Sequence, residues 1–490
     1  MGVLDNLEPK AVFHYFEEIS RIPRPSHGEK AVSDYLVSFA KERNLEVYQD
    51  EIYNVIMIKE ATPGYENEEP IILQGHMDMV CEKAPDVTKD MNTEGLDLEI
   101  RDNAIWAKGT TLGGDDGIAV AYALALLDSD TLKHPRLEFV CTVCEEVGMD
   151  GAHAVDCSPL KGHLLLNMDS EEEGIVLAGC AGGGESKVSL EVEREACDWP
   201  RMLVRIHGLM GGHSGAEIHK GRASSVTLMG RVLREAAKVT GLRLVSAVNG
   251  SKDNAISREG SMIAAVEDPK AFAAKIEELQ TAISAEYVVA DKNVRLECSM
   301  LMQGFGTEKA DGIAMADPLT RQSTDQVIVL LAALPQGIQR MSDNVPGLVE
   351  TSLNWGVAEL DEEKFEMKAA VRSSVGTAYT ELADRITCIA KGIGAKNEMS
   401  AEYPAWEWVQ ESVLRDKLAV IYREMFGSEL KIEAIHAGVE CGLLAGKIPN
   451  LDAVSMGPDI IDIHTPNEHL DIASTQRMWN FIVSIIETKN

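Results

Sequence analysis

The sequence of 490 residues lacks the features of a secreted or membrane-spanning protein. Its nine cysteines are an odd number scattered from Cys81 to Cys441, which is not the pattern of a secreted disulfide framework. The N-terminal segment has acidic residues and helical periodicity where a signal peptide needs a basic and then an apolar region. No stretch approaches the roughly 18 to 20 uninterrupted apolar residues of a membrane span. We therefore expect a cytoplasmic protein with reduced thiols.

Positive charge is scarce. The chain has 46 lysines and arginines against 79 aspartates and glutamates, so its formal net charge is −33. Such a field repels nucleic acids and anionic membranes, and it favours solubility and the attraction of cations. We expect no nucleic-acid or membrane partner.

The length predicts more than one domain, because single cores stop growing at roughly 250 to 300 residues. Strands that alternate with helices in residues 1–183 and 400–490 predict one α/β domain with a central mixed sheet flanked by helices. Residues 184–399 instead show two tandem β-α-β-β-α patterns, which predict an α+β domain with its own sheet. The second domain therefore interrupts the first.

The chain is organised around the segment 70–80, PIILQGHMDMV, in which an apolar strand ends in His76 and Asp78. Residues i and i+2 of an extended segment lie on one face, so both side chains can enter one pocket. An imidazole beside a carboxylate suits zinc, which takes nitrogen and oxygen ligands. This pair alone also fits an ordinary histidine near a turn.

More acidic residues follow the next predicted strands. In TTLGGDDGIAVAYALALLDS, glycines allow a tight turn around Asp115 and Asp116 before an apolar, buried helix, although Asp116 also fits a helix cap. The strand RLEFVCTVC delivers Glu145 and Glu146, and the strand HLLLN is followed by Asp169. Ligands in open α/β sheets gather beyond the carboxyl ends of the strands. These side chains exceed the needs of one ion, and they would suit two zinc ions that share a bridging carboxylate.

Taken in order, the motifs G-H-x-D, G-G-D-D-G, E-E-x-G, N-M-D-S-E and H-T-P-N-E resemble those of the metallopeptidase family of aminoacylases, carboxypeptidases and dipeptidases. The subgroup of Xaa-His dipeptidases, or bacterial carnosinases, is similar over the whole chain, including the insert. The resemblance implies a zinc pair, with Co²⁺ or Mn²⁺ as possible replacements. It assigns the metal ligands to His76, Asp115, Glu146, Asp169 and His464, with Asp115 as the bridge.

The same resemblance implies the remaining roles. Glu145 would be the general base, and Asp78 would orient His76. His464 is favoured over His469, and Asp116 is not made a ligand.

The insert would be a lid domain. The motif GLMGGHSGAEIHKGRAS implies that His213 approaches the scissile carbonyl oxygen, with His219 as the alternative. Substrate-binding roles would fall to Asn254, Arg372 and Gly438. A guanidinium such as that of Arg372 can bind a peptide carboxylate with two parallel hydrogen bonds.

These expectations favour a dizinc dipeptidase for short peptides, including Xaa-His dipeptides such as carnosine. Two alternatives stay open: an N-acyl-amino-acid hydrolase of the same family, and a noncatalytic protein that retains metal. The doubled insert leaves both a monomer and a homodimer possible.

Overall fold

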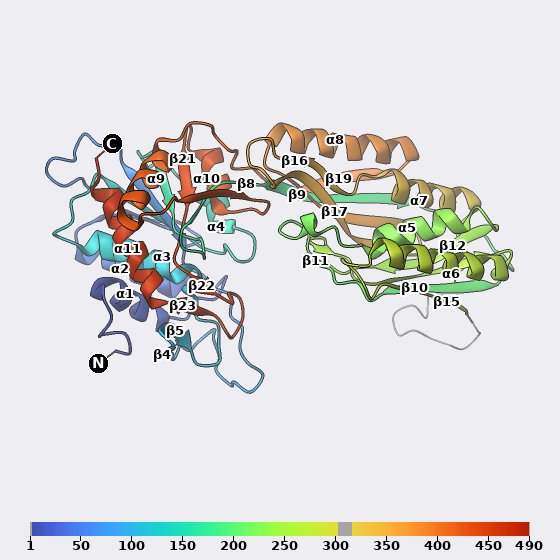
Figure 1. The fold of residues 1–490 in the computed structure, drawn as a ribbon, viewed down its shortest axis with the longest axis horizontal. Coiled ribbons are helices and arrows are strands. Elements are labelled where there is room, and N and C mark those ends of the chain that lie inside the picture. Colours follow the sequence, from blue (N-terminus) through green and yellow to red (C-terminus); the bar gives the residue numbers. More distant parts are fainter. Residues whose placement is uncertain (1, 302–315, 490) are drawn as a thin grey trace. The chain divides into compact units, whose positions relative to one another are not determined.

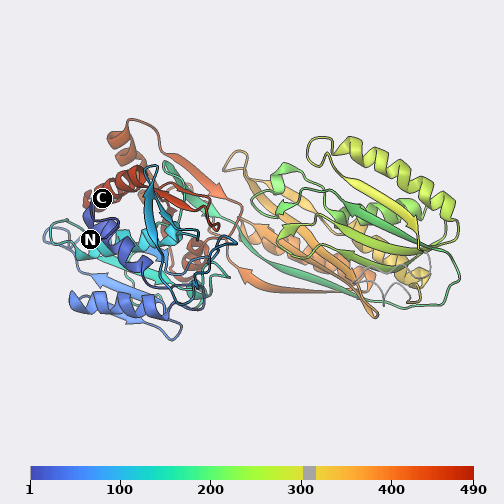
Figure 2. The ribbon, with the colours of Figure 1, turned by 90° about the horizontal axis from the view of Figure 1, so that it is seen from below.

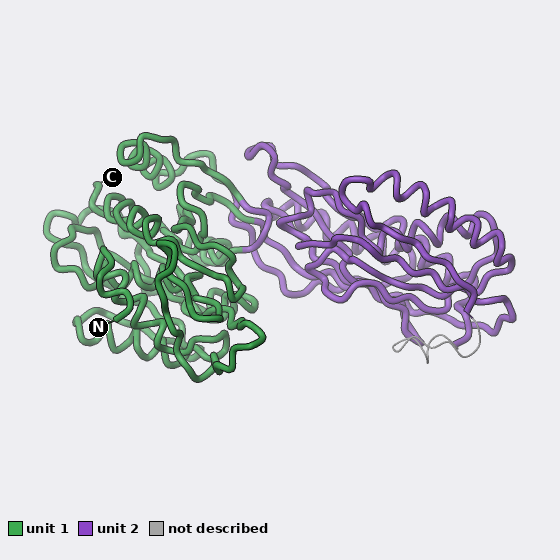
Figure 3. The backbone as a smooth tube through the Cα atoms, turned by 60° about the horizontal axis from the view of Figure 1, so that its bottom comes forward, with its two compact units in different colours: residues 1–180, 408–434, 439–490 green, residues 181–407, 435–438 purple. Residues whose placement is uncertain are grey.

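The computed structural model describes residues 2–301 and 316–489, and the chain forms two compact units (Figure 3). Unit 1 contains residues 1–180, 408–434 and 439–490, and unit 2 contains residues 181–407 and 435–438. The boundaries predicted at 183/184 and 399/400 are wrong by a few residues. They fall inside strands β9 (Gly182–Glu191) and β19 (Lys396–Tyr403), which belong whole to unit 2. Sheet pairing sets these boundaries, and local sequence does not reveal it.

Unit 1 is built on a mixed eight-stranded sheet, as the sequence predicts. Strand β3 (Ile71–His76) lies between β6 (Leu137–Thr142) and β7 (Leu164–Asn167) and is parallel to both. The sheet order is β1-β2-β6-β3-β7-β21-β8-β20, and the remaining strands are β1 (Glu46–Gln49), β2 (Val55–Lys59), β21 (Asp452–Ser455), β8 (Ile175–Cys180) and β20 (Lys431–Ile435). Because β3, β6 and β7 run the same way, their carboxyl ends lie at one edge of the sheet.

Helices cover this sheet, and the chain's two ends both belong to unit 1, as the blue and red segments of Figure 2 show. Helix α3 (Gly114–Asp128) is buried from Gly114 to Leu127, which confirms the predicted buried apolar helix. The other helices are α1 (Lys10–Ser20), α2 (Lys30–Glu42), α4 (Asp150–Ala154), α9 (Val413–Phe426), α10 (Glu440–Lys447) and α11 (Ile472–Glu487). A small sheet, β22-β23-β5-β4, joins strands Ile460–Ile461, His469–Asp471, Ala104–Ala107 and Leu98–Arg101.

Unit 2 contains one continuous sheet of nine strands, with the order β15-β10-β14-β12-β17-β18-β9-β19 and β16 paired to β17. Besides β9 and β19, its strands are β10 (Arg201–His207), β12 (Leu242–Asn249), β14 (Gly260–Val266), β15 (Arg295–Met300), β16 (Gly337–Met341), β17 (Val349–Leu360) and β18 (Lys364–Ser373). The expected start of the second tandem pattern, β15, pairs instead with β10 of the first pattern. The two patterns therefore share one sheet.

Four helices pack against one face of this sheet through a single apolar core (Figure 1). They are α5 (Ser225–Ala236), α6 (Pro269–Glu286), α7 (Arg321–Ala333) and α8 (Gly376–Ile393). A short ribbon of β11 (Gly212–His213) and β13 (Ala255–Ile256) joins two loops, and the 3-10 helix η1 (Ile218–Lys220) follows β11. None of the described helices is both long and apolar enough to cross a bilayer. None of the nine cysteines, all of which lie in the described residues, forms a disulfide.

Candidate active site

The site in unit 1 begins at the end of the central strand β3. His76 is the last residue of β3 and is almost fully buried, and its Nδ1 lies 3.3 Å from Asp78 Oδ1, at ion-pair distance but outside hydrogen-bond geometry. Asp78 also accepts hydrogen bonds from the backbone N–H groups of Glu145 (3.1 Å) and Glu146 (3.3 Å) and from Ser26 Oγ (2.8 Å). One buried carboxylate thus lies beside the imidazole and holds the loop that carries both glutamates.

Asp115 lies between two histidines. Its Oδ1 is 3.0 Å from His76 Nε2, and its Oδ2 is 3.1 Å from His464 Nε2. On one side Asp169 Oδ1 lies 3.5 Å from His76 Nε2, and on the other side Glu146 Oε2 lies 3.0 Å from His464 Nε2. The two oxygens of a single carboxylate therefore face two separate groups of ligand-type side chains. This is the arrangement that a carboxylate bridging two cations needs.

Asp116 is nearer to this centre than the sequence analysis expected. Its Oδ2 accepts the backbone N–H of His76 at 3.2 Å. Within the described ranges, two groups of side chains have candidate ligand atoms within 4.8 Å of one another, and one of them is His76, Asp116 and Asp169. The other such group is His76, Asp115 and Glu146. Gly75 makes room for Asp116, because a Cβ there would lie 2.4 Å from its Oδ2.

Buried carboxyl groups crowd around the two imidazoles. Burial raises the pKa of Asp169 to about 7 and that of Glu171 to about 7. Burial also raises the pKa values of Asp116 and Glu145 well above the ordinary range. Hydrogen bonds that the imidazole donates to the carboxylates of Asp115 and Glu146 raise the pKa of His464 to about 10.

This crowding is the test of fit for metal ions. Carboxylates packed this closely in a buried place are stabilised by cations, and nitrogen with oxygen ligands suits zinc, cobalt or manganese. The side chains therefore fit divalent cations: Asp115 and Asp169 lie beside His76, and Asp115 and Glu146 lie beside His464. Glu145 forms no ion pair with a histidine among the described residues, which leaves its carboxylate available for another role.

The histidine alternatives near the C-terminus are separated by the fold. His464 lies in the cluster, whereas the His469 ring stacks on Trp106 with 3.9 Å between ring centroids.

Two residues that the sequence analysis missed hold the surrounding loops. Glu468 accepts backbone N–H groups of Leu112, Gly113 and Gly114 just before Asp115, and buried Arg24 donates to the carbonyls of Met77, Asp78 and Gly113. The glutamate of H-T-P-N-E was a visible signal for Glu468, whereas nothing in RIPRPSHGE marks Arg24.

Unit 2 gathers the other predicted residues in a polar corner. His213 Nδ1 accepts the backbone N–H groups of Gly215 (3.3 Å) and Ala216 (3.0 Å), so the proton of a neutral imidazole is on Nε2 and can be donated. Asn254 directly precedes β13, and Ser214 directly follows β11. The backbone carbonyl of Asn254 accepts the N–H of Ser214 at 2.9 Å. His219, the alternative to His213, is exposed on η1.

Arg372 and Gly438 both adjoin Tyr403. Arg372 Nη1 donates to the Tyr403 hydroxyl at 2.9 Å, and a Cβ at Gly438 would lie 2.7 Å from the Tyr403 ring. Gly438 lies in residues 435–438, which the fold joins to unit 2 although they follow a segment of unit 1.

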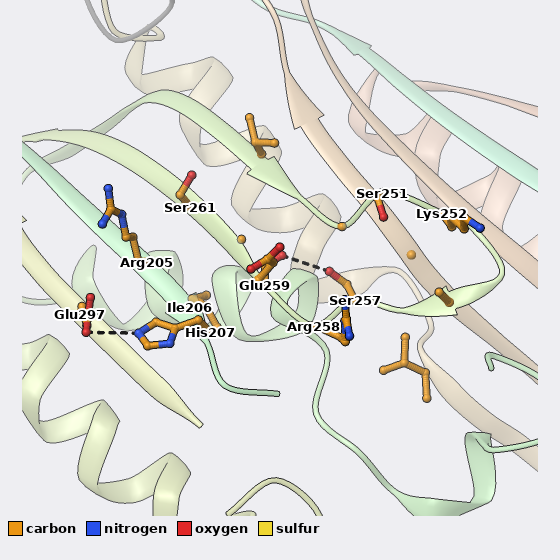
Figure 4. A pocket seen from close by; sticks show the side chains of 16 residues that line it. Arg205, Ile206, His207, Ser251, Lys252, Ser257, Arg258, Glu259, Ser261 and Glu297 are labelled. Atoms are coloured by element: carbon orange, nitrogen blue, oxygen red, sulfur yellow. Dashed lines mark hydrogen bonds and ion pairs between the residues drawn. The ribbon is translucent and has the colours of Figure 1, made fainter. Parts of the chain in front are cut away.

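A separate cavity of about 630 Å³ in unit 2 has none of the predicted site residues in its lining (Figure 4). Arg205, Lys252 and Arg258 line it together with His207, which forms an ion pair with Glu297 at 3.2 Å. This cavity therefore does not coincide with the predicted active-site residues.

Comparison with known proteins identifies the family. The chain matches the model of peptidase family M20/M25/M40 over residues 72–488. It is 35% identical over 491 residues to the cytosol non-specific dipeptidase of Escherichia coli (strain K12), with 99% of both chains covered. The crystal structure of an aminoacylhistidine dipeptidase from Vibrio alginolyticus matches with a TM-score of 0.91 and 35% identity, covering 99% of this chain and 98% of that one. The aminopeptidase PepT of Bacillus cereus, at 15% identity and a TM-score of 0.54 over 98% of each chain, shares the fold.

The chain belongs to peptidase family M20/M25/M40. The family resemblance inferred from the ordered motifs is confirmed.

Proposed function

We propose that the chain is a metal-dependent dipeptidase that hydrolyses short peptides with a free C-terminal carboxylate, including Xaa-His dipeptides such as carnosine. The observation that supports this most is the Asp115 carboxylate, whose two oxygens face His76 and His464. The relatives named as a non-specific dipeptidase and an aminoacylhistidine dipeptidase match nearly the whole chain, and they support the same substrate class. The name of the first relative also supports a cytoplasmic location.

In this proposal the cofactor is two zinc ions, replaceable by cobalt or manganese. Such a pair lowers the pKa of a water molecule and stabilises the negative charge that develops on the peptide carbonyl oxygen. His76 and Asp169 would hold one ion, His464 and Glu146 would hold the other, and Asp115 would be shared by both.

The remaining residues move protons and bind the peptide. Glu145 takes a proton from the attacking water as the new C–O bond forms, and it passes the proton to the leaving amine nitrogen as the C–N bond breaks. His213 donates its Nε2–H to the developing oxyanion, and unit 2 is the lid domain that the family resemblance implies. Asn254, Arg372 and Gly438 bind the substrate, with Arg372 on its carboxylate.

A substrate panel on metal-reconstituted protein tests the proposal. We expect hydrolysis of Xaa-His and other dipeptides after addition of Zn²⁺, Co²⁺ or Mn²⁺, and much slower hydrolysis of N-acetyl amino acids. Faster cleavage of N-acetyl amino acids would assign the chain to the N-acyl-amino-acid hydrolases. No cleavage of either class by protein with bound metal would indicate a noncatalytic metal-binding protein.

A further inference from the structure

Four residues of unit 2 form a row across four adjacent strands. Ser352 of β17 pairs with Arg372 of β18, Arg372 pairs with Gly183 of β9, and Gly183 pairs with Tyr403 of β19. Residues paired in this way present their side chains on the same face of a sheet. A Cβ at Gly183 would lie 2.8 Å from the Tyr403 hydroxyl, so the glycine leaves the space in which Arg372 reaches across to Tyr403.

Arg372 is a buried cation with no carboxylate counterion in the described part of the chain. It is 9% exposed, its Nε has no hydrogen-bond partner, and no carboxylate lies within ion-pair distance of it among the described residues. Buried charges in proteins are ordinarily paired, because an uncompensated one is costly. In a chain with 79 acidic residues, an unpaired guanidinium points to an anion that arrives with a ligand.

His436 lies beside this guanidinium and also has a ring nitrogen without a hydrogen-bond partner among the described residues. It is 5% exposed, and its Nε2 lies 2.7 Å from Ser352 Oγ, the neighbour of Arg372 in the row. Its Nδ1 has no partner among the described residues. Burial and the charge of Arg372 lower the pKa of His436 to about 3, so the ring is neutral and carries a single proton. If the Ser352 hydroxyl donates to Nε2, that proton is on Nδ1.

The backbone brings these groups to one place. A Cβ at Gly215 would lie 2.4 Å from the His436 carbonyl oxygen and 3.0 Å from Arg372 Nε. The neighbouring Ser214 Oγ is also buried and has no partner in the described part of the chain. Three unsatisfied polar atoms, on Ser214, Arg372 and His436, thus belong to one buried corner.

We propose that His436, held by Ser352, is a specificity-determining residue that donates Nδ1–H to the C-terminal carboxylate of the substrate alongside Arg372. This inference rests on the proposed dipeptidase function and adds a second recognition group to it. A site built to hydrogen-bond a group discriminates against analogues that cannot accept those bonds. The enzyme should therefore prefer a free carboxylate over a neutral carboxamide because of His436 as well as Arg372.

The test compares Ala-His with its C-terminal amide in the zinc-loaded enzyme. Glutamine places its amide near the position of Nε2 and asparagine near that of Nδ1, so His436→Gln keeps the contact to Ser352 and His436→Asn keeps a donor for the ligand. We expect His436→Gln to lower the acid-to-amide ratio of kcat/KM about tenfold through a higher KM for the acid. His436→Asn should retain more of the preference, and Ser352→Ala should lose part of it. His207→Gln, in the ion pair of Figure 4, is the matched control and should keep the wild-type ratio.

An unchanged ratio in folded His436→Gln would overturn the inference, and so would equal losses in the Gln and Asn variants. If His436→Gln does not fold, Ser352→Ala decides, and a wild-type ratio there contradicts the role. Calorimetric binding of Ala-His and its amide to the zinc-loaded Glu145→Gln protein gives the same comparison without turnover. A binding preference that depends on His436, together with absent hydrolysis by the wild type, would refute the dipeptidase function and leave the carboxylate site standing.

Discussion

At the scale of single residues, Glu145 and Glu146 are adjacent in sequence but have different surroundings. Glu146 lies 3.0 Å from His464 in the candidate metal cluster, whereas Glu145 forms no ion pair with a histidine in the described ranges. We expect Glu145→Gln to retain both metal ions and to lower kcat by about 10² to 10⁴, which is the usual contribution of a general base. Elemental analysis and steady-state kinetics on the same sample would measure both effects.

Glu146→Gln is the matched control for that variant. It removes a charged ligand candidate one position along the chain, so we expect metal loss together with loss of activity. Wild-type turnover in Glu145→Gln would exclude Glu145 as the base. Full metal content in Glu146→Gln would exclude Glu146 as a ligand.

Sequence reasoning predicted that candidate side chains lie together where local spacing relates them, and the structure brings them together. His76 and Asp78 alternate on a strand, and Asp115 sits in a glycine-rich turn before a buried helix. It missed Arg24 and Tyr403, because their contacts depend on loops and strands that are distant in sequence. Asp116 was not made a ligand, because the family that the motifs resemble tolerates several residues at that position, although its carboxylate accepts the backbone N–H of His76.

At the scale of elements, strand β3 depends on having no side chain at Gly75. A Cβ there would lie 2.4 Å from Asp116 Oδ2 and 2.7 Å from Ala119 Cβ of helix α3. Overpacking of this kind costs about 1 to 3 kcal/mol. We expect Gly75→Ala to lower the thermal stability of unit 1 by that amount and to weaken metal binding, as measured by calorimetry and by metal titration.

Gly392 of helix α8 is the control for this substitution. A Cβ there would meet no atom within 4 Å, and alanine is favoured over glycine inside a helix by up to about 1 kcal/mol. Gly392→Ala should therefore leave unit 1 unchanged and slightly stabilise unit 2. Equal destabilisation by both substitutions would contradict the close packing of β3 on Asp116.

The elements of unit 2 show where local patterns stop being informative. Hydrophobic periodicity located its helices and strands, but it assigned β15 to the second tandem pattern, whereas β15 pairs with β10. The partner of a strand is decided by long-range hydrogen bonds and a shared apolar core, neither of which has a local signature. The same limit explains why residues 435–438 were not predicted to join unit 2.

At the scale of the whole molecule, one buried histidine of unit 2 makes the stability of the fold depend on pH. The pKa of His436 in the folded chain is about 3, below the value of about 6.5 for an unfolded chain, so only the unfolded chain binds its proton in between. Stability is therefore lost as pH falls below about 6.5, by about 1.4 kcal/mol at about pH 5.5.

We expect the wild type to lose about that much more stability than His436→Gln when the pH is lowered from about 7.5 to 5.5. Chemical denaturation at both pH values measures this difference, and the titration of other groups cancels between the two proteins. Parallel losses in the two proteins would show that His436 titrates normally in the folded state.

Metal ions should change the thermal stability of unit 1. The two units have separate apolar cores, so we expect two thermal transitions, which Gly75→Ala and His436→Gln assign to unit 1 and unit 2. The candidate ligands all belong to unit 1, and a ligand at about 100 times its Kd stabilises the folded state by about 2.7 kcal/mol. Zinc should therefore raise the transition of unit 1, a chelator should lower it, and the transition of unit 2 should stay within error. A zinc-dependent shift confined to unit 2 would place the metal away from Asp115, and no shift in either unit would refute the metal centre.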